Sequence, residues 1–173
     1  PAMRQVTDRL VLADPKFDSE GKESHGPGVT PDGSQLWLTV QTTNGVVVVS
    51  TADHKILARI PVGRDPNWVG FTPDGGKAVI SSTGAGEVSI VDGHPGRWGS
   101  PLALSAIRSV LLYGEEAFDN LGIGMGCGDV NGDGYADLVL CAKNAAGPGN
   151  TRTSGGQAHI VFGGTSLPST IDL

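Results

Sequence analysis

The sequence predicts an all-β chain made of short antiparallel strands. Two segments, residues 28–38 and 70–80, align at an offset of 42 residues, and each contains the tetrapeptide Thr-Pro-Asp-Gly. The composition fits such a fold, because only 5% of the residues are aromatic while 27 are glycine. A repeat of about this length, built of strands and turns, is typical of a β-propeller, whose blades stack to bury their faces. We therefore expect propeller-type blades, each a four-stranded antiparallel sheet, in a partial or small ring.

The N-terminal half divides into a lead-in and two copies of the repeat. Residues 1–23 are expected to form an N-terminal strand or lead-in, and residues 24–92 two blades. In each copy the Pro-Asp-Gly turn suits a tight reversal, because Pro presets φ and Gly tolerates positive φ. A strand follows the turn, and the Val-rich strand 46–50 aligns with 88–92. This half resembles the YVTN family of propellers. The period then fails, and the Gly- and Pro-rich stretch 93–109 predicts a junction.

After the junction comes a loop, residues 129–137, with oxygen-bearing side chains at alternate positions. Hard cations such as Ca²⁺ take six to eight oxygen ligands from carboxylates, amides, carbonyls and water. Two glycines inside the loop allow the backbone angles needed to wrap around an ion. The sequence therefore predicts a calcium site with four side-chain ligands and one carbonyl ligand, from Asp129, Asn131, Asp133, Asp137 and the backbone of Tyr135.

The loop differs from an EF-hand. An EF-hand requires a bidentate Glu at position 12 and flanking helices, whereas position 12 here is Leu140, inside the apolar run 138–142 that predicts a buried strand. With its flanks, residues 122–142 and 156–164, the loop resembles the FG-GAP repeat of integrin alpha chains and bacterial surface proteins. The resemblance covers about residues 110–173 and implies a blade whose first two strands are joined by the calcium loop.

Two repeat types in one chain are an unusual combination. Each family usually closes a ring from its own repeat, and propellers have at least four blades. Three explanations stay open: a fragment of a larger protein, an engineered or assembled hybrid, or a small ring completed by several copies of the chain.

Two cysteines, Cys127 and Cys141, flank the calcium loop. They have the same parity, so symmetric strand pairing would turn both side chains to one face. A disulfide there would close a loop of about 15 residues and add roughly 3 kcal/mol of stability. The alternative is a pair of small buried apolar residues, since free cysteine is commonly buried.

Charge and hydropathy limit the classes of partner. The net charge is −6, which argues against nucleic acid, because nucleic-acid binding needs a basic surface. No segment has the ~20 apolar residues of a membrane helix, so no membrane insertion is expected. The expected partners are a protein or glycan ligand, and self-association is a route to ring completion.

The sequence offers no convincing catalytic set. The four histidines share no ligand spacing, and no Cys-x-x-Cys, His-Glu-x-x-His or nucleophile elbow is present. His25 lies where some YVTN-type enzymes place axial ligands, but Asn67 takes the matching place in the second repeat. We expect a non-catalytic, calcium-stabilised binding or scaffold module of a secreted, cell-surface or periplasmic protein. The alternatives are a fragment of a periplasmic propeller enzyme (oxidoreductase or hydrolase) and a hybrid without native function.

Overall fold

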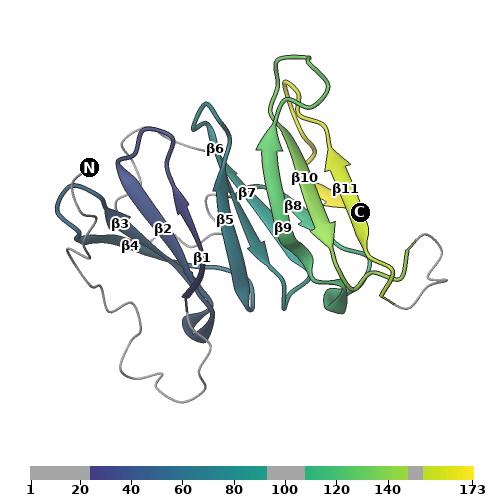
Figure 1. Ribbon diagram of the computed structural model, residues 1–173, viewed down its shortest axis with the longest axis horizontal. Coiled ribbons are helices and arrows are strands. Elements are labelled where there is room, and N and C mark those ends of the chain that lie inside the picture. The colour runs from purple at the N-terminus through teal and green to yellow at the C-terminus, as the bar shows by residue number, and fades with distance from the viewer. Residues whose placement is uncertain (1–23, 93–107, 148–153) are drawn as a thin grey trace, which may run out of the picture.

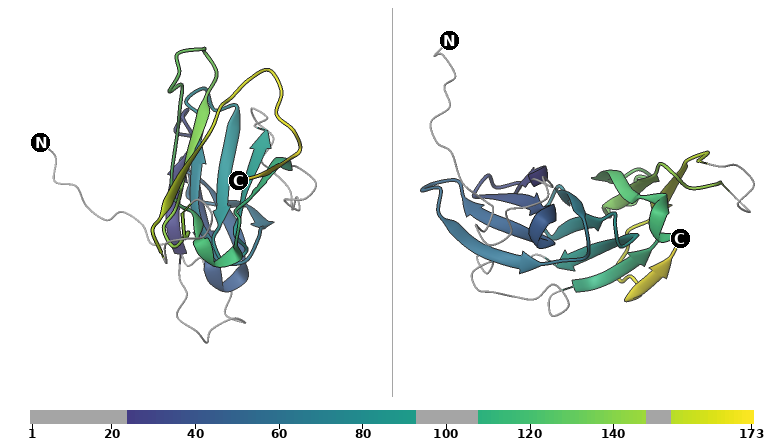
Figure 2. Two further views of the ribbon diagram at one scale, coloured as in Figure 1. Left: turned by 90° about the vertical axis from the view of Figure 1, so that its right-hand side faces the viewer. Right: turned by 90° about the horizontal axis from the view of Figure 1, so that it is seen from below.

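The computed structural model describes residues 24–92, 108–147 and 154–173. Within these residues three β-sheets stack side by side, from the N-terminal half at the left of Figure 1 to the C-terminal half at the right. Seen from below, the sheets form an open row and no closed ring (Figure 2). Among the described residues, no helix has the length and apolar character needed to cross a bilayer.

The first sheet is an antiparallel meander in which each strand pairs with the next one along the chain. Its strands are β1 (Ser24–Val29), β2 (Gln35–Val40), β3 (Gly45–Ser50) and β4 (Ile56–Pro61). A short 3₁₀ turn, η2 (Gln41–Thr43), joins the middle two strands.

The second sheet repeats this meander and adds a fifth strand. Its antiparallel strands are β5 (Pro66–Phe71), β6 (Lys77–Ser82), β7 (Glu87–Asp92) and β8 (Arg108–Tyr113). The C-terminal strand β12 (Thr170–Asp172) pairs in parallel with β8 at the outer edge. These two sheets confirm the predicted four-stranded antiparallel blades.

The third sheet has three strands in the described part of the chain. They are β9 (Leu121–Gly128), β10 (Asp137–Ala142) and β11 (Gln157–Val161), and a 3₁₀ turn, η3 (Ala117–Asp119), precedes them.

One sheet boundary differs from the expected division of the chain. Residues 110–113 were expected to open the calcium-loop blade, but they belong to β8, which pairs with β7 and completes the second sheet. The physical reason is the alternation in this strand: Val110 and Leu112 are buried on the face turned to the third sheet. The boundary expected at residue 110 therefore falls inside the second sheet. The lead-in 1–23 and most of the junction 93–109 lie outside the described residues.

The first strands of the three sheets, β1, β5 and β9, are neighbours in space. Glycines permit this close approach. A Cβ built on Gly28 would lie 2.7 Å from the carbonyl oxygen of Val69, and one built on Gly70 would lie 3.3 Å from the Met125 methyl carbon. In a β-propeller the first strands of successive blades lie side by side around an axis, and β1, β5 and β9 have this arrangement.

Two apolar cores hold the stack together, one on each side of the second sheet. Between the first and second sheets, Trp37 is fully buried and its ring meets Phe71 edge-on, with centroids 5.5 Å apart. Trp37 therefore packs between the first two sheets. Between the second and third sheets, Leu112, Leu121 and Leu140 are fully buried. Alternate residues of β6 and β7 supply both cores, because the side chains of a strand point to opposite faces in turn.

Candidate metal site

The predicted calcium loop joins β9 to β10 at the upper end of the third sheet in Figure 1. Gly128 and Asp137 are the last paired residues on either side of it. Gly132 and Gly134 have φ of 80° and 88°, a region that side-chain-bearing residues rarely adopt. The loop therefore lies between two antiparallel strands, as the resemblance to the FG-GAP repeat implies.

Asp129 organises the first half of the loop. Its Oδ1 accepts hydrogen bonds from the backbone N–H groups of Gly132 (2.7 Å) and Asp133 (3.1 Å), and its Oδ2 accepts one from Gly134 (2.8 Å). These donors stabilise the charged form, so they hold the pKa of Asp129 below its usual value, with the Gly134 N–H as the largest cause.

Asn131 and Asp133 form a second hydrogen-bonded pair on the exposed side of the loop. The Asn131 side-chain amide donates to Asp133 Oδ2 at 2.9 Å, and the Asp133 N–H donates to Asn131 Oδ1 at the same distance. The N–H of Tyr135 donates to Asp133 Oδ1 at 2.8 Å. Both oxygens of Asp133 thus already accept hydrogen bonds inside the loop.

Asp137 differs from the other candidate ligands because it is buried, with 1% of its surface exposed. Its Oδ2 accepts a hydrogen bond from the N–H of Val130, and its Oδ1 accepts one from the N–H of Gly163, both at 2.8 Å. A Cβ on Gly163 would lie 2.3 Å from the carbonyl oxygen of Ala136, so only glycine fits there. Asp137 therefore connects the loop to the segment that follows β11.

The donor chemistry of the loop fits a hard cation, because every candidate ligand is a carboxylate, amide or carbonyl oxygen. The carboxylates nevertheless do not converge. Within the described residues, no three His, Cys, Asp or Glu side chains come close enough together to hold a metal. As arranged, the carboxylates of Asp129, Asp133 and Asp137 accept hydrogen bonds from N–H groups of the chain. Asp129 Oδ1 already accepts two hydrogen bonds, whereas an oxygen that accepts only one, such as Asp129 Oδ2, keeps a second lone pair for a cation.

The two cysteines lie on opposite faces of the third sheet, which excludes a disulfide between them. Cys127 pairs with Leu138 and faces the second sheet, whereas Cys141 pairs with Gly124 and is exposed on the other side. The reason is the register: with Gly128 opposite Asp137, residues of equal parity on the two strands point in opposite directions. Both cysteines are free.

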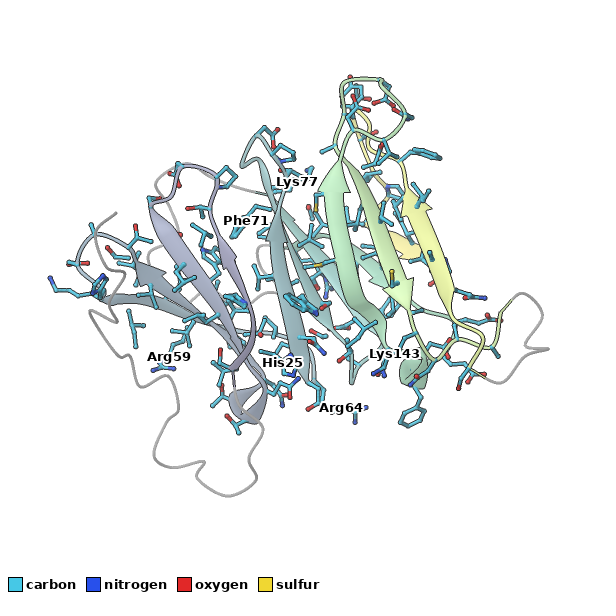
Figure 3. All side chains as sticks on the ribbon, in the orientation of Figure 1. His25, Arg59, Arg64, Phe71, Lys77 and Lys143 are labelled. Carbon is cyan, nitrogen blue, oxygen red and sulfur yellow. The ribbon has the colours of Figure 1, made fainter. Side chains whose placement is uncertain are left out.

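His25 and Asn67 lie far from the calcium loop. Figure 3 places His25 at the lower end of the stack, while the loop is at the upper end. Asn67 is buried, and its amide donates to Thr83 Oγ1 at 3.5 Å. The structure therefore brings neither residue to the candidate metal site. Trp98 and His94 lie outside the described residues.

Sequence reasoning missed a cavity of about 310 Å³ between the second and third sheets. Its apolar wall includes Val79, Leu138 and Val161, and its rim includes Lys77 and Tyr135. Tyr135 belongs to the calcium loop, so the cavity and the loop share a wall. The sequence carried no signal for the cavity, because it arises from how two sheets distant in sequence pack together.

Comparisons with known proteins support part of this description. An FG-GAP repeat matches residues 124–161, about a fifth of the chain, which include the calcium loop. Among solved structures, hydrazine synthase from Kuenenia stuttgartiensis is similar, with 18% identity, a TM-score of 0.47, and coverage of 68% of this chain. The chain spans about a third of the length of that solved chain (33%). No curated protein matches the sequence. The resemblance of residues 24–92 to YVTN propellers stays a prediction.

Proposed function

We propose that this chain is a calcium-stabilised, propeller-type binding or scaffold module of a secreted, cell-surface or periplasmic protein, without catalytic activity. The observation that carries the proposal is the oxygen-rich loop of residues 129–137, which lies within the matched FG-GAP repeat and is tied to the sheet by Asp137. The third sheet, whose strands β9 and β10 flank the loop, provides the rigid support on which such a loop presents binding groups.

The ligands proposed for calcium are the side chains of Asp129, Asn131, Asp133 and Asp137 and the backbone carbonyl of Tyr135. When bound, a calcium ion supplies positive charge that neutralises crowded carboxylates. At millimolar calcium, a dissociation constant of about 10 µM would add roughly 2.7 kcal/mol to the free energy of unfolding. For a chain of this size that corresponds to a rise in Tm of roughly 5–10 °C.

The hydrogen bonds of Asp137 explain how ordering of the loop would also stabilise the third sheet. Asp137 is the first residue of β10, and its carboxylate holds both Val130 in the loop and Gly163 beyond β11. An ion that holds this carboxylate in place would also hold the first half of the loop, the start of β10 and the segment after β11. The role proposed for calcium is therefore structural, and partner recognition is assigned to the outer surface of the same loop, where the Tyr135 ring is exposed.

The test is a thermal melt of the native chain in millimolar Ca²⁺ and in chelator, alongside Asp133→Ala. Asp133 is exposed, so its loss leaves the apolar cores intact. Asp53→Ala is the matched control, because Asp53 is an exposed carboxylate in the turn between β3 and β4, paired with Lys55 at 2.7 Å. We expect calcium to raise Tm in the native chain and in Asp53→Ala but not in Asp133→Ala. Identical melts of the native chain with and without calcium, and no heat of binding by calorimetry, would refute the proposal.

A further inference from the structure

The cavity between the second and third sheets lies at a position that an aromatic ring fills at the neighbouring interface. The first two sheets are related by the 42-residue offset in the sequence, so Trp37 on β2 corresponds to Val79 on β6. Trp37 packs between the first and second sheets, whereas Val79 packs between the second and third. Val79 and its cross-strand partner Ile90 both line the cavity of about 310 Å³. The smaller side chain of the second copy therefore leaves space where the first copy holds an indole ring.

The inner wall of this cavity is apolar. Val79, Ile90 and Leu138 are 2%, 3% and 5% exposed and belong to the core between the two sheets. Cys127 and Val161 pack against the same core and also line the cavity. Pockets for small molecules start at about 300 Å³, and an apolar cavity of about 150 Å³ already holds a benzene ring. The cavity therefore has room for one aromatic ring with a short chain.

One carboxylate in the cavity wall keeps an oxygen without a partner. Asp74 is exposed, and it lies in the Thr-Pro-Asp-Gly turn before β6. Its Oδ1 accepts hydrogen bonds from Thr72 Oγ1 at 2.6 Å and from the Gly76 N–H at 2.9 Å. Among the described residues, no group donates a hydrogen bond to its Oδ2. The bonds from Thr72 and Gly76 lower the pKa of Asp74, so this carboxylate is charged at neutral pH.

The first copy of the turn fills the corresponding position. Ser34 stands where the second copy has Gly76, and its hydroxyl lies 2.9 Å from both carboxylate oxygens of Asp32. Gly76 has no side chain that could do the same for Asp74. The second copy of the turn therefore differs from the first in two ways that both serve a ligand: a missing ring and an unpaired carboxylate oxygen.

The other charged groups in the cavity wall favour a positively charged ligand. Lys77, at the upper end of the stack in Figure 3, forms an ion pair with Asp92, so its charge is already compensated. Asp137 is the second carboxylate in the wall, and its oxygens accept backbone hydrogen bonds. A wall in which carboxylates predominate attracts cations and disfavours anions.

From these observations we propose that the cavity binds a small arylalkyl amine, in which a short chain joins an aromatic ring to a primary amine. The ring lies against Val79 and Ile90, in the place that corresponds to the Trp37 indole. The protonated amine donates a charge-assisted hydrogen bond to Oδ2 of Asp74. This ligand site goes beyond the binding or scaffold role proposed above. It does not require calcium, because the residues that hold the ring and the amine are not proposed calcium ligands.

The experiment is a titration of the full chain with phenethylamine in chelator, measured by calorimetry and by backbone NMR. The matched control ligand is 3-phenylpropionate, which has the same ring but the opposite charge. Asp74→Asn removes the charge and keeps an acceptor oxygen for the turn, and Val79→Trp fills the cavity as Trp37 fills the first interface. Asp32→Asn, the same change in the first copy of the turn, is the control variant. Circular dichroism and melting show whether each variant is folded.

We expect saturable binding of phenethylamine with amide shifts at the cavity wall, and roughly tenfold weaker binding of 3-phenylpropionate. Asp74→Asn should weaken phenethylamine binding roughly fivefold or more. Gly76→Ser should do the same, because it restores the hydroxyl that occupies the carboxylate in the first copy. Val79→Trp should abolish binding, and Asp32→Asn should leave it unchanged.

Three results would overturn the proposal: no saturable binding by the native chain, equal affinity for the two ligands, or binding that Asp74→Asn and Gly76→Ser leave unaffected. If Val79→Trp does not fold, the two turn variants decide the outcome. Because every titration is made in chelator, failure of this proposal leaves the calcium proposal standing, and the reverse also holds.

Discussion

The backbone N–H of Gly163 donates a hydrogen bond to the Asp137 carboxylate over 2.8 Å, although the two residues are 26 positions apart. The second oxygen of the same carboxylate accepts from Val130 in the loop. One buried side chain thus satisfies two backbone donors from different segments. Because buried polar groups are costly to leave unpaired, this carboxylate should matter for stability even without calcium.

We predict that Asp137→Asn lowers the free energy of unfolding by about 1–3 kcal/mol in the presence of chelator. The amide keeps one acceptor oxygen, so its NH₂ group must face one of the two N–H donors. Asp133→Asn, on the exposed side of the loop, should change the free energy by less than about 0.5 kcal/mol. Urea denaturation in chelator measures both, and equal effects for the two variants would contradict the structural role of Asp137.

A second prediction concerns the pH dependence of the loop without calcium. Hydrogen bonds from Gly134 and Gly132 lower the folded-state pKa of Asp129 below its ordinary value of 3.8. A lowered carboxylate pKa stabilises the fold above the unfolded pKa, and this stabilisation is lost as the pH falls through the folded pKa. The native chain should therefore have a higher free energy of unfolding than Asp129→Asn near neutral pH. This difference should disappear below about pH 4. Urea denaturation of both chains in chelator, from neutral to acidic pH, measures this difference. A difference that stays constant with pH would contradict the prediction.

Two glycines, one on β1 and one on β9, provide a third prediction. Gly28→Ala places a methyl group 2.7 Å from the carbonyl oxygen of Val69, so we expect a loss of about 1–3 kcal/mol from overpacking. Gly126→Ala meets open space and has no positive φ, so it should be neutral or stabilising by up to about 1 kcal/mol. Thermal melts at low protein concentration compare the two. Equal losses would show that the first two sheets do not pack as closely as described.

A feature of this fold could be predicted when the residues that determine it lie close together in the sequence. The Thr-Pro-Asp-Gly turns are local, and in the structure Thr30 Oγ1 and Thr72 Oγ1 each donate to the Asp two residues later at 2.6 Å. These two repeats therefore predicted the first two blades. The loop of residues 129–137 was equally visible, since its spacing alone indicates oxygen ligands.

The features that sequence reasoning missed depend on pairing across distance. β8 joins the second sheet because Val110 and Leu112 match the apolar pattern of β7, which the broken repeat period concealed. The parallel pairing of β12 with β8 had no signal in the sequence. The parity argument for Cys127 and Cys141 assumed a symmetric hairpin, but only the register shows which residues share a face.

That register leads to the last prediction, on the reactivity of the cysteines. Cys141 is exposed on the face of the third sheet that points away from the second sheet, whereas Cys127 is partly buried toward the second sheet. Burial raises the pKa of the Cys127 thiol. Because the thiolate is the reactive form, Cys127 should alkylate more slowly than Cys141. Iodoacetamide labelling of the folded chain, followed by peptide mass analysis, measures the two rates, and Cys141→Ser should leave only the slow reaction. Equal rates in the folded chain, or an unreactive pair that labels only after reduction, would contradict the placement of the two thiols on opposite faces.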